Sequence, residues 1–237
     1  MSRVRFVLRL AALVATLILA LLIHGLWRLF RLPSPWPRLF LGIVARIVGA
    51  RPCTIGTPLR RDVVFVSNHL SWIDILLIAG ASGSAFVAKS ELRAVPLVGW
   101  LCTLNHTIFV SREDRLGVTA QIATIRDALA KAWPVTVFPE GTTGDGHMLL
   151  PFKAALLAVL EPPPLGVMVQ PIRIDYGDAT DELAWVGEEP GDAHAKRVLS
   201  RPGTFRPTLR FCAPFDPADF PGRKAIAAEA RRRIEAA

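Results

Sequence analysis

Two side chains between residues 67 and 74 have the chemistry for proton transfer. His69 follows the apolar run Asp62–Ser67, which reads as a buried strand, and Asp74 begins an apolar stretch typical of a helix. An imidazole takes up a proton near neutral pH, and a neighbouring carboxylate fixes its tautomer and stabilises the imidazolium. We predict a general base and its orienting group. Two alternatives remain: Ser71 and Asp74 also fit a helix-capping box, and a histidine at a strand end can be purely structural.

A second polar cluster follows the strand-like run Val135–Phe138. Pro139 ends the strand and Glu140 falls at the carboxyl edge of the expected sheet, where ligands bind in open α/β folds. The backbone N–H groups and hydroxyls of Gly141, Thr142 and Thr143 are suited to an anion or a developing oxyanion. The alternative is a polar turn in which Glu140 binds backbone groups.

Two cations also stand at the ends of strand-like runs. Arg112 ends Ile108–Arg112 and Lys89 ends Phe86–Lys89, so both are candidates for binding a phosphate. For each, a solvated surface charge is the competing interpretation. A further run, Val169–Ile172, carries a proline within an apolar strand, which predicts a sheet edge or a bulge.

The elements that must position these residues alternate between strand and helix along the chain. Expected strands are 62–67, 84–88, 107–111, 135–138, 167–174 and 208–212, and expected helices are 73–80, 97–104, 117–132, 153–160 and 224–236. Such alternation predicts an α/β fold with a mixed, partly parallel sheet flanked by helices.

The N-terminal part differs from the rest in hydropathy. Leu10–Trp27 is long and apolar enough to cross a membrane, with arginines on both sides, and Leu39–Val48 is a shorter apolar helix. The shorter helix can lie in the membrane interface, fold back on the first, or belong to the globular core. We predict membrane-anchoring helices over residues 1–52 and a globular domain over 53–237. The arginine distribution favours the inner membrane with that domain facing the cytoplasm.

The net charge and the cysteine content limit the classes of partner and of metal or disulfide site that the chain can have. A net charge of +8 and a mean hydropathy of +0.37 favour anionic lipids or phosphorylated substrates, and the sequence shows no zinc-finger or RNA-binding pattern. We therefore expect a lipid bilayer as partner and no nucleic acid. The three cysteines, Cys53, Cys102 and Cys212, match no metal or disulfide pattern and are expected as small core residues.

Taken together, the motifs resemble those of the 1-acylglycerol-3-phosphate O-acyltransferase family of membrane-bound lysophospholipid acyltransferases. Its four motifs correspond to an Asn-His-x-x-x-x-Asp (HX4D) segment, an arginine after an apolar strand, Phe-Pro-Glu-Gly-Thr, and a proline in an apolar run. In this chain they are Asn68–Asp74, Phe109–Arg112, Phe138–Thr142 and Val169–Pro171.

The resemblance implies an O-acyltransferase of glycerolipid synthesis. His69 would deprotonate the free hydroxyl of a lysophospholipid, which then attacks the thioester of acyl-CoA or acyl-carrier protein, while Asp74 holds His69. Arg112, Glu140, Gly141 and Thr142, helped by Lys89, would position the acceptor. No metal or organic cofactor is implied. The first-choice acceptor is 1-acylglycerol-3-phosphate, which gives phosphatidate.

One departure favours a different acceptor. Many relatives that act on lysophosphatidate have arginine where this chain has Thr143, and the block that follows looks similar to the branch that acylates lyso-ornithine lipid. Asp145 could then meet an amine, although a turn role is the alternative. A catalytically inactive lipid-binding protein and a hydrolase are the competing functions. We expect His194 to be structural and Arg231–Arg233 to form a solvated or lipid-facing basic surface.

Overall fold

The fold is organised around one seven-stranded sheet. The computed structural model describes residues 2–32, 34–110 and 118–237, with the backbone only for residues 118–121. The strands are β1 (Cys53–Ile55), β2 (Val63–Ser67), β3 (Ala85–Lys89), β4 (Ile108–Val110), β5 (Val135–Val137), β6 (Met168–Asp175) and β7 (Thr208–Phe211). Their order across the sheet is β1-β7-β6-β2-β5-β3-β4, and only the β6–β7 pairing is antiparallel. The predicted α/β class with a mixed sheet is therefore confirmed.

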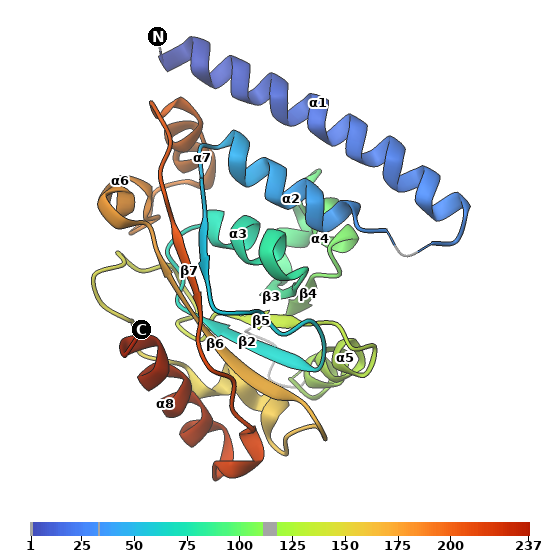
Figure 1. Cartoon of the computed structure of the whole chain (residues 1–237), viewed down its shortest axis with the longest axis vertical. Helices are drawn as coiled ribbons and strands as arrows, with labels where there is room; N and C mark the ends of the chain where they lie inside the picture. The colour runs from blue at the N-terminus through green and yellow to red at the C-terminus, as the bar shows by residue number, and fades with distance from the viewer. Residues whose placement is uncertain (1, 33, 111–117) are drawn as a thin grey trace.

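Helices cover both faces of this sheet (Figure 1). The α-helices are α1 (Ser2–Leu29), α2 (Trp36–Ile47), α3 (Ile73–Ser82), α4 (Val98–Leu104), α5 (Val118–Ala130), α6 (Thr180–Leu183), α7 (Gly191–Ser200) and α8 (Gly222–Glu235). Four 3-10 segments complete the described elements: η1 (Ser90–Ala94), η2 (Ala154–Leu160), η3 (Gly177–Ala179) and η4 (Pro217–Asp219).

Strand β2 is central because it is apolar on both faces. Val63 and Phe65 belong to the core cluster that includes α2 and α3, whereas Val64 and Val66 belong to the cluster that includes α5 and α8. Successive side chains of a strand point to opposite faces, so a continuous apolar run is what a sheet covered on both sides requires. All five residues of β2 are buried. The strand therefore holds its carboxyl end, where the HX4D motif begins, in a fixed place.

Two differences from the predicted elements have identifiable causes, one local and one non-local. The segment expected as a helix over 153–160 is the 3-10 segment η2, in which Leu157 leaves helical backbone angles. Strand β1 was missed because it is short and exposed, and its pairing with β7 depends on residues more than 150 positions away. Such non-local pairing leaves no periodic signal in a three-residue run.

Pro171 lies in the interior of the sheet, so the edge-strand alternative is wrong and the bulge is confirmed. Strand β6 is bordered by β7 and β2. Ile172 pairs with Phe211 and Val169 with Phe215, so the two residues between them on β6 face the three residues 212–214. A bulge on the partner tolerates a residue that lacks an N–H donor.

The prediction that the three cysteines are small core residues is wrong. Cys53 is exposed, and Cys102 and Cys212 are half-buried. All three are free thiols. Burial raises the pKa of Cys102 and Cys212, which disfavours their thiolate forms.

The N-terminal helices pack on the globular part. Among the described residues, α1 is the one helix long and apolar enough to cross a membrane, a property that a buried core helix or a signal sequence can share. It lies along α2 and reaches α7 (Figure 1). The Arg9 guanidinium donates to the carbonyls of Val198, Leu199, Arg201 and Gly203, at and beyond the carboxyl end of α7. Helix α2 folds back on α1 and also contributes Val44 and Ala45 to the core. Of the three alternatives for this helix, packing on the first helix and membership of the globular core are therefore both observed. The division after residue 52 stays a prediction.

Helices α2 and α3 approach closely at a pair of glycines. A Cβ on Gly80 would lie 2.9 Å from the Gly42 Cα atom, closer than side chains tolerate. We expect Gly80→Val to force the helices apart and lower the free energy of unfolding by about 1–3 kcal/mol. Urea unfolding of the full chain in detergent measures this. Gly25→Ala is the control, because no atom lies within 4 Å of the Cβ position there. Equal stability of Gly80→Val and the native chain would contradict the close packing.

Candidate active site

His69 and Asp74 form the predicted pair. The Nδ1 atom of His69 lies 2.9 Å from Oδ2 of Asp74. Asp74 is fully buried at the first turn of α3, whereas the His69 side chain is 18% exposed. The turn between β2 and α3 therefore places a solvent-accessible imidazole in contact with a carboxylate that solvent does not reach.

Asp74 is surrounded by hydrogen-bond donors. Its Oδ2 also accepts from the backbone N–H groups of Leu70 and Ser71, at 2.7 and 3.0 Å, and its Oδ1 accepts from the Tyr176 hydroxyl. The backbone contacts that the capping alternative required are present, and the histidine contact exists beside them. Since every other neighbour donates to Asp74, the carboxylate acts as acceptor and His69 carries its hydrogen on Nδ1. The Nε2 atom is then left as the proton acceptor.

Tyr176 is the member of this group that sequence reasoning missed. It directly follows β6, more than 100 residues after Asp74, and is buried. Burial, together with the charge of Asp74, raises the pKa of its phenol well above the usual value, so the hydroxyl keeps its proton and remains a donor. It is the single tyrosine of the chain, but only the β2–β6 pairing places it beside Asp74.

Asn68 explains why the HX4D segment has a defined position. Its side-chain amide donates to the Ile174 carbonyl at 2.9 Å, and its carbonyl oxygen accepts from the Ile174 N–H at 2.8 Å. This reciprocal pair continues the β2–β6 ladder one residue past the end of β2. His69 therefore begins from a backbone that is already fixed on both sides.

The Phe-Pro-Glu-Gly-Thr segment packs directly against the base. Strand β5 is parallel to β2, so both motifs leave the sheet at the same edge. The Phe138 ring stacks on the His69 imidazole with centroids 3.9 Å apart and 16° between the planes. The Gly144 N–H donates to the His69 carbonyl at 2.8 Å. The imidazole is thus held by stacking on one face and by Asp74 at its edge.

Glu140 is used internally, as the polar-turn alternative proposed. Its Oε1 accepts from the His69 N–H at 3.3 Å and its Oε2 from the Leu150 N–H at 3.4 Å, and only 3% of the residue is exposed. Burial raises its pKa to about 7, with the Asp74 charge adding to the shift; the two backbone bonds and Arg231 oppose it. Glu140 therefore ties the HX4D segment to the loop over residues 141–150.

The other predicted site residues are less closely gathered. Gly141 takes a backbone φ of +74° and its N–H donates to the Phe138 carbonyl, while Thr142 is exposed. Lys89 is exposed at the carboxyl end of β3 and is not among the residues that line the cavity beside His69. Arg112 lies outside the described residues. The structure therefore brings together His69, Asp74 and Glu140 and leaves Lys89 apart.

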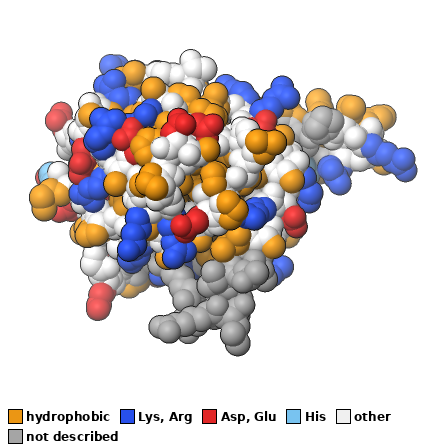
Figure 2. Space-filling model, turned by 90° about the horizontal axis from the view of Figure 1, so that it is seen from below, with side chains coloured by type: hydrophobic (Ala, Val, Ile, Leu, Met, Phe, Trp, Pro, Cys, Tyr) orange, Lys and Arg blue, Asp and Glu red, His pale blue; other side chains and the backbone are white. Residues whose placement is uncertain are grey.

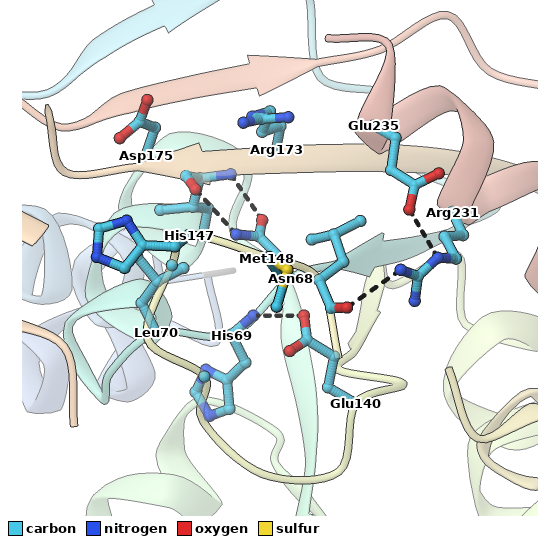
Figure 3. A pocket seen from close by; sticks show the side chains of 14 residues that line it. Asn68, His69, Leu70, Glu140, His147, Met148, Arg173, Asp175, Arg231 and Glu235 are labelled. Atoms are coloured by element: carbon cyan, nitrogen blue, oxygen red, sulfur yellow. Dashed lines mark hydrogen bonds and ion pairs between the residues drawn. The ribbon is translucent and has the colours of Figure 1, made fainter. Parts of the chain in front are cut away.

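A cavity of about 350 Å³ lies next to His69 and Glu140. Its opposite wall carries Arg173, Asp175 and Glu235, and the His69 ring points away from that wall (Figure 3). Among the described lining residues none comes from α1 or α2. In the part of the chain that the structure describes, no group of three or more His, Cys, Asp or Glu side chains could hold a metal ion.

His194 has the structural role that was predicted. It is buried, and its Nδ1 accepts from the Trp72 indole N–H at 2.8 Å, whereas its Nε2 donates to the Leu183 carbonyl at 3.1 Å. Burial lowers its pKa, in keeping with a neutral ring. Trp72 belongs to the HX4D segment, so α7 supports that segment from behind.

The arginines of α8 form an ion-paired surface. Arg231 contacts Glu235, and both Arg232 and Arg233 contact Glu229. Seen from below, this side of the molecule intersperses basic, acidic and hydrophobic side chains (Figure 2). Of the two alternatives, a solvated charged face fits better than a uniform lipid-binding one.

Removing the Tyr176 hydroxyl tests the donor set around Asp74. Tyr176→Phe leaves a buried carboxylate with one donor fewer, so we expect the free energy of unfolding to fall by about 1.5–3 kcal/mol. Phe205 packs against the Tyr176 ring with centroids 5.6 Å apart. Tyr176→Phe removes the hydrogen bond to Asp74, whereas Phe205→Leu removes only the contact between the rings. Each variant is made in the native chain and in an Asp74→Asn background, and its stability is measured by urea unfolding. The loss of stability from Tyr176→Phe should be smaller in the Asp74→Asn background, whereas the loss from Phe205→Leu should be the same in both. Unchanged stability of Tyr176→Phe would contradict the bond.

Glu140 predicts a pH-dependent stability. Because its folded pKa of about 7 exceeds its ordinary value of 4.5, the folded protein retains a proton that the unfolded chain loses between these values. The free energy of unfolding should therefore fall by about 1–3 kcal/mol from pH 4.5 to 7, relative to Glu140→Gln, and the difference should stay constant above pH 7. Urea unfolding across this range measures it. Glu188→Gln, at an exposed site, should follow the native profile. Parallel curves for native chain and Glu140→Gln would refute the assignment.

Comparisons with known proteins agree with this geometry. The acyltransferase family profile matches residues 53–175. The lyso-ornithine lipid O-acyltransferase of Rhodobacter capsulatus is 31% identical, covering 96% of this chain and 87% of the relative, and that of Brucella abortus is 34% identical over 84% and 80%. The 1-acyl-sn-glycerol-3-phosphate acyltransferase of Neisseria gonorrhoeae is 32% identical over 50% and 46%.

A solved structure shares the fold. The crystal structure of PlsC, the 1-acyl-sn-glycerophosphate acyltransferase from Thermotoga maritima, superposes with a TM-score of 0.69 at 23% identity, covering 100% of this chain and 97% of that one. The profile match spans the HX4D and Phe-Pro-Glu-Gly-Thr segments that meet at His69. On its sequence and on the arrangement of these two motifs, the chain belongs to the acyltransferase family.

Proposed function

We propose that this protein transfers a fatty acyl group from acyl-CoA or acyl-carrier protein to the free hydroxyl of lyso-ornithine lipid. The observation that carries the reaction type is the His69–Asp74 pair, with Nδ1 held at 2.9 Å and Nε2 left as acceptor. The acceptor rests on the relatives, since the matches that cover most of this chain are lyso-ornithine lipid O-acyltransferases.

The chemistry needs no enzyme-bound acyl group. His69 Nε2 takes the proton of the lipid hydroxyl as its oxygen bonds to the thioester carbonyl carbon. The tetrahedral intermediate then breaks its carbon–sulfur bond, and the thiol leaves with the proton that His69 returns. Such base catalysis contributes about 10²–10⁴-fold, so positioning of the two substrates must supply much of the remaining acceleration. Thioester cleavage provides the driving force without a metal or organic cofactor.

Thr143 supports lyso-ornithine lipid over the first-choice acceptor, 1-acylglycerol-3-phosphate. The position at which related enzymes place an arginine is occupied here by a hydroxyl that donates to the Trp185 carbonyl. This residue therefore closes a loop and offers no positive charge to a phosphomonoester. Asp145 accepts from the His147 N–H and is exposed, which is the turn role, and we assign it no contact with the acceptor.

We base the proposed membrane association on α1. Its inner face packs on the protein through Phe6 and Leu13, whereas its outer face exposes residues such as Leu19 and Leu22. A helix that is apolar on both faces, and docked on the protein by one of them, suits an anchor whose outer face enters the hydrocarbon of the membrane. We place the protein at the inner membrane with its globular part in the cytoplasm, where acyl thioesters are made.

A panel of lyso-lipids tests the identity of the acceptor, and the variant His69→Ala tests the assignment of His69 as the general base. Membranes containing the protein are incubated with labelled acyl-CoA or acyl-carrier protein and with lyso-ornithine lipid or lysophosphatidate. We expect acylated ornithine lipid to form at least tenfold faster than phosphatidate, and His69→Ala to abolish both while folding and membrane association persist.

Other outcomes identify the competing functions. Faster phosphatidate formation would restore 1-acylglycerol-3-phosphate as the acceptor. Free fatty acid without acylated lipid would indicate a hydrolase. Full activity of His69→Ala would overturn the base assignment, and no turnover of any acceptor by the native chain would favour a lipid-binding protein. Glu188→Ala is the control, because that side chain is exposed and is not among the residues that line the cavity beside His69.

A further inference from the structure

We infer that the segment formed by η1 and the start of α4 is a second membrane-contacting surface that enters the bilayer beside α1. Its apolar members, here called the η1–α4 patch, are Leu92, Val95, Leu97, Val98 and Trp100. The inference rests on the proposed function, in which the acceptor is a membrane lipid.

The η1–α4 patch gathers several exposed apolar side chains within one short stretch of chain. Residues 91–98 are all exposed, and the exposed fraction rises to 54% at Leu97. Contiguous apolar surface of this kind marks a site of association, whereas single exposed apolar residues do not. The ion-paired surface around α8 shows the contrast, since charges of both signs are interspersed there (Figure 2).

Backbone geometry presents the patch outward. Leu97 has a φ of +64°, a conformation that a branched side chain rarely adopts. A Cβ on Gly99 would lie 2.3 Å from the Arg93 carbonyl oxygen, so the first turn of α4 packs tightly on η1. Leu97 therefore combines a strained backbone with an exposed apolar side chain. Both are unfavourable for the folded protein in water, and strained residues of this kind cluster at functional sites.

Continuity with α1 identifies the bilayer as the occupant. One apolar groove of about 440 Å³ is lined by α1 residues such as Leu17 and Leu21 and by patch residues Leu97 and Val98. The patch and the proposed anchor thus form neighbouring walls of one apolar surface. An interfacial element that borders an embedded helix meets the same lipids.

Charge at the border of the patch agrees with an anionic membrane. Lys89 precedes η1 and is exposed, and Arg93 lies within η1 with its guanidinium 5.6 Å from the Phe109 ring centre. Basic side chains at the rim of an apolar surface are attracted to anionic headgroups. Lys89 also ends β3, at the sheet edge that carries His69. Contact here would hold that edge against the membrane from which the acceptor comes.

Spin labels distinguish lipid from water at chosen positions. In the full chain with Cys53→Ser, Cys102→Ala and Cys212→Ala, a single label is placed by Val98→Cys, Leu22→Cys or Leu165→Cys. Leu165 is fully exposed in the loop before β6, at the opposite edge of the sheet from Lys89. Each protein is reconstituted in vesicles of phosphatidylcholine and phosphatidylglycerol, and collisions with oxygen are compared with those of a water-soluble nickel chelate.

The expected result is a lipid-like oxygen preference at residue 98, close to that at residue 22 and several-fold above residue 165. A water-like value at 98 beside a lipid-like value at 22 overturns the second contact and leaves the anchor intact. Water-like values at both overturn the anchor as well. Spin–spin broadening at 98 between labelled copies would assign the patch to self-association and overturn the inference.

A matched pair of polar variants gives an independent measure. Val98→Gln with Trp100→Gln should weaken vesicle binding of the full chain at least about tenfold, because two apolar side chains no longer enter the bilayer. Leu165→Gln with Val186→Gln removes two exposed apolar side chains outside the patch and should bind like the native chain. Equal binding of the two double variants would overturn the inference. Glutamine is a good helix former, so α4 is retained.

Discussion

The buried carboxylate of Asp74 is the group on which the arrangement of the active site depends. An ionised carboxylate without partners is costly in a protein interior, and this one accepts hydrogen bonds from two backbone N–H groups, a phenol and an imidazole. Each donor arrives from a fixed part of the fold: the turn after β2 supplies the imidazole and both N–H groups, and the residue after β6 supplies the phenol. The need to satisfy one acceptor thus fixes the tautomer and orientation of His69, and it does so before any substrate binds.

The sheet supplies this arrangement through parallel pairing. Strands β2, β5 and β6 are neighbours, and their carboxyl ends bring His69, Phe138 and Tyr176 to one edge. Asn68 extends the β2–β6 ladder, and Glu140 links the two loops that leave β2 and β5. The motif residues of the family therefore divide by role in this chain: in the proposed reaction His69 transfers the proton and Asp74 orients it, whereas Asn68, Phe138 and Glu140 hold the surrounding backbone and ring in place.

The N-terminal region and the η1–α4 patch give the molecule a common apolar surface. Helix α1 is fastened by Arg9 to the end of α7, and α2 is shared between this region and the core. In the proposed reaction an acyl donor and a membrane lipid meet at one imidazole, and these contacts connect the apolar surface to the sheet that carries it. Close packing of Gly42 against Gly80 provides part of that rigidity.

The sequence by itself determined the α/β class, the principal strands and the pairing of His69 with Asp74, because these depend on local periodicity and on residues five positions apart. It did not determine the internal use of Glu140, the partnership of Tyr176, or the interior place of Pro171. Those depend on which strands are neighbours, a choice made by burial of apolar faces over separations of up to about a hundred residues. Local pattern therefore predicted which groups meet at the candidate site, and tertiary pairing decided which groups hold them.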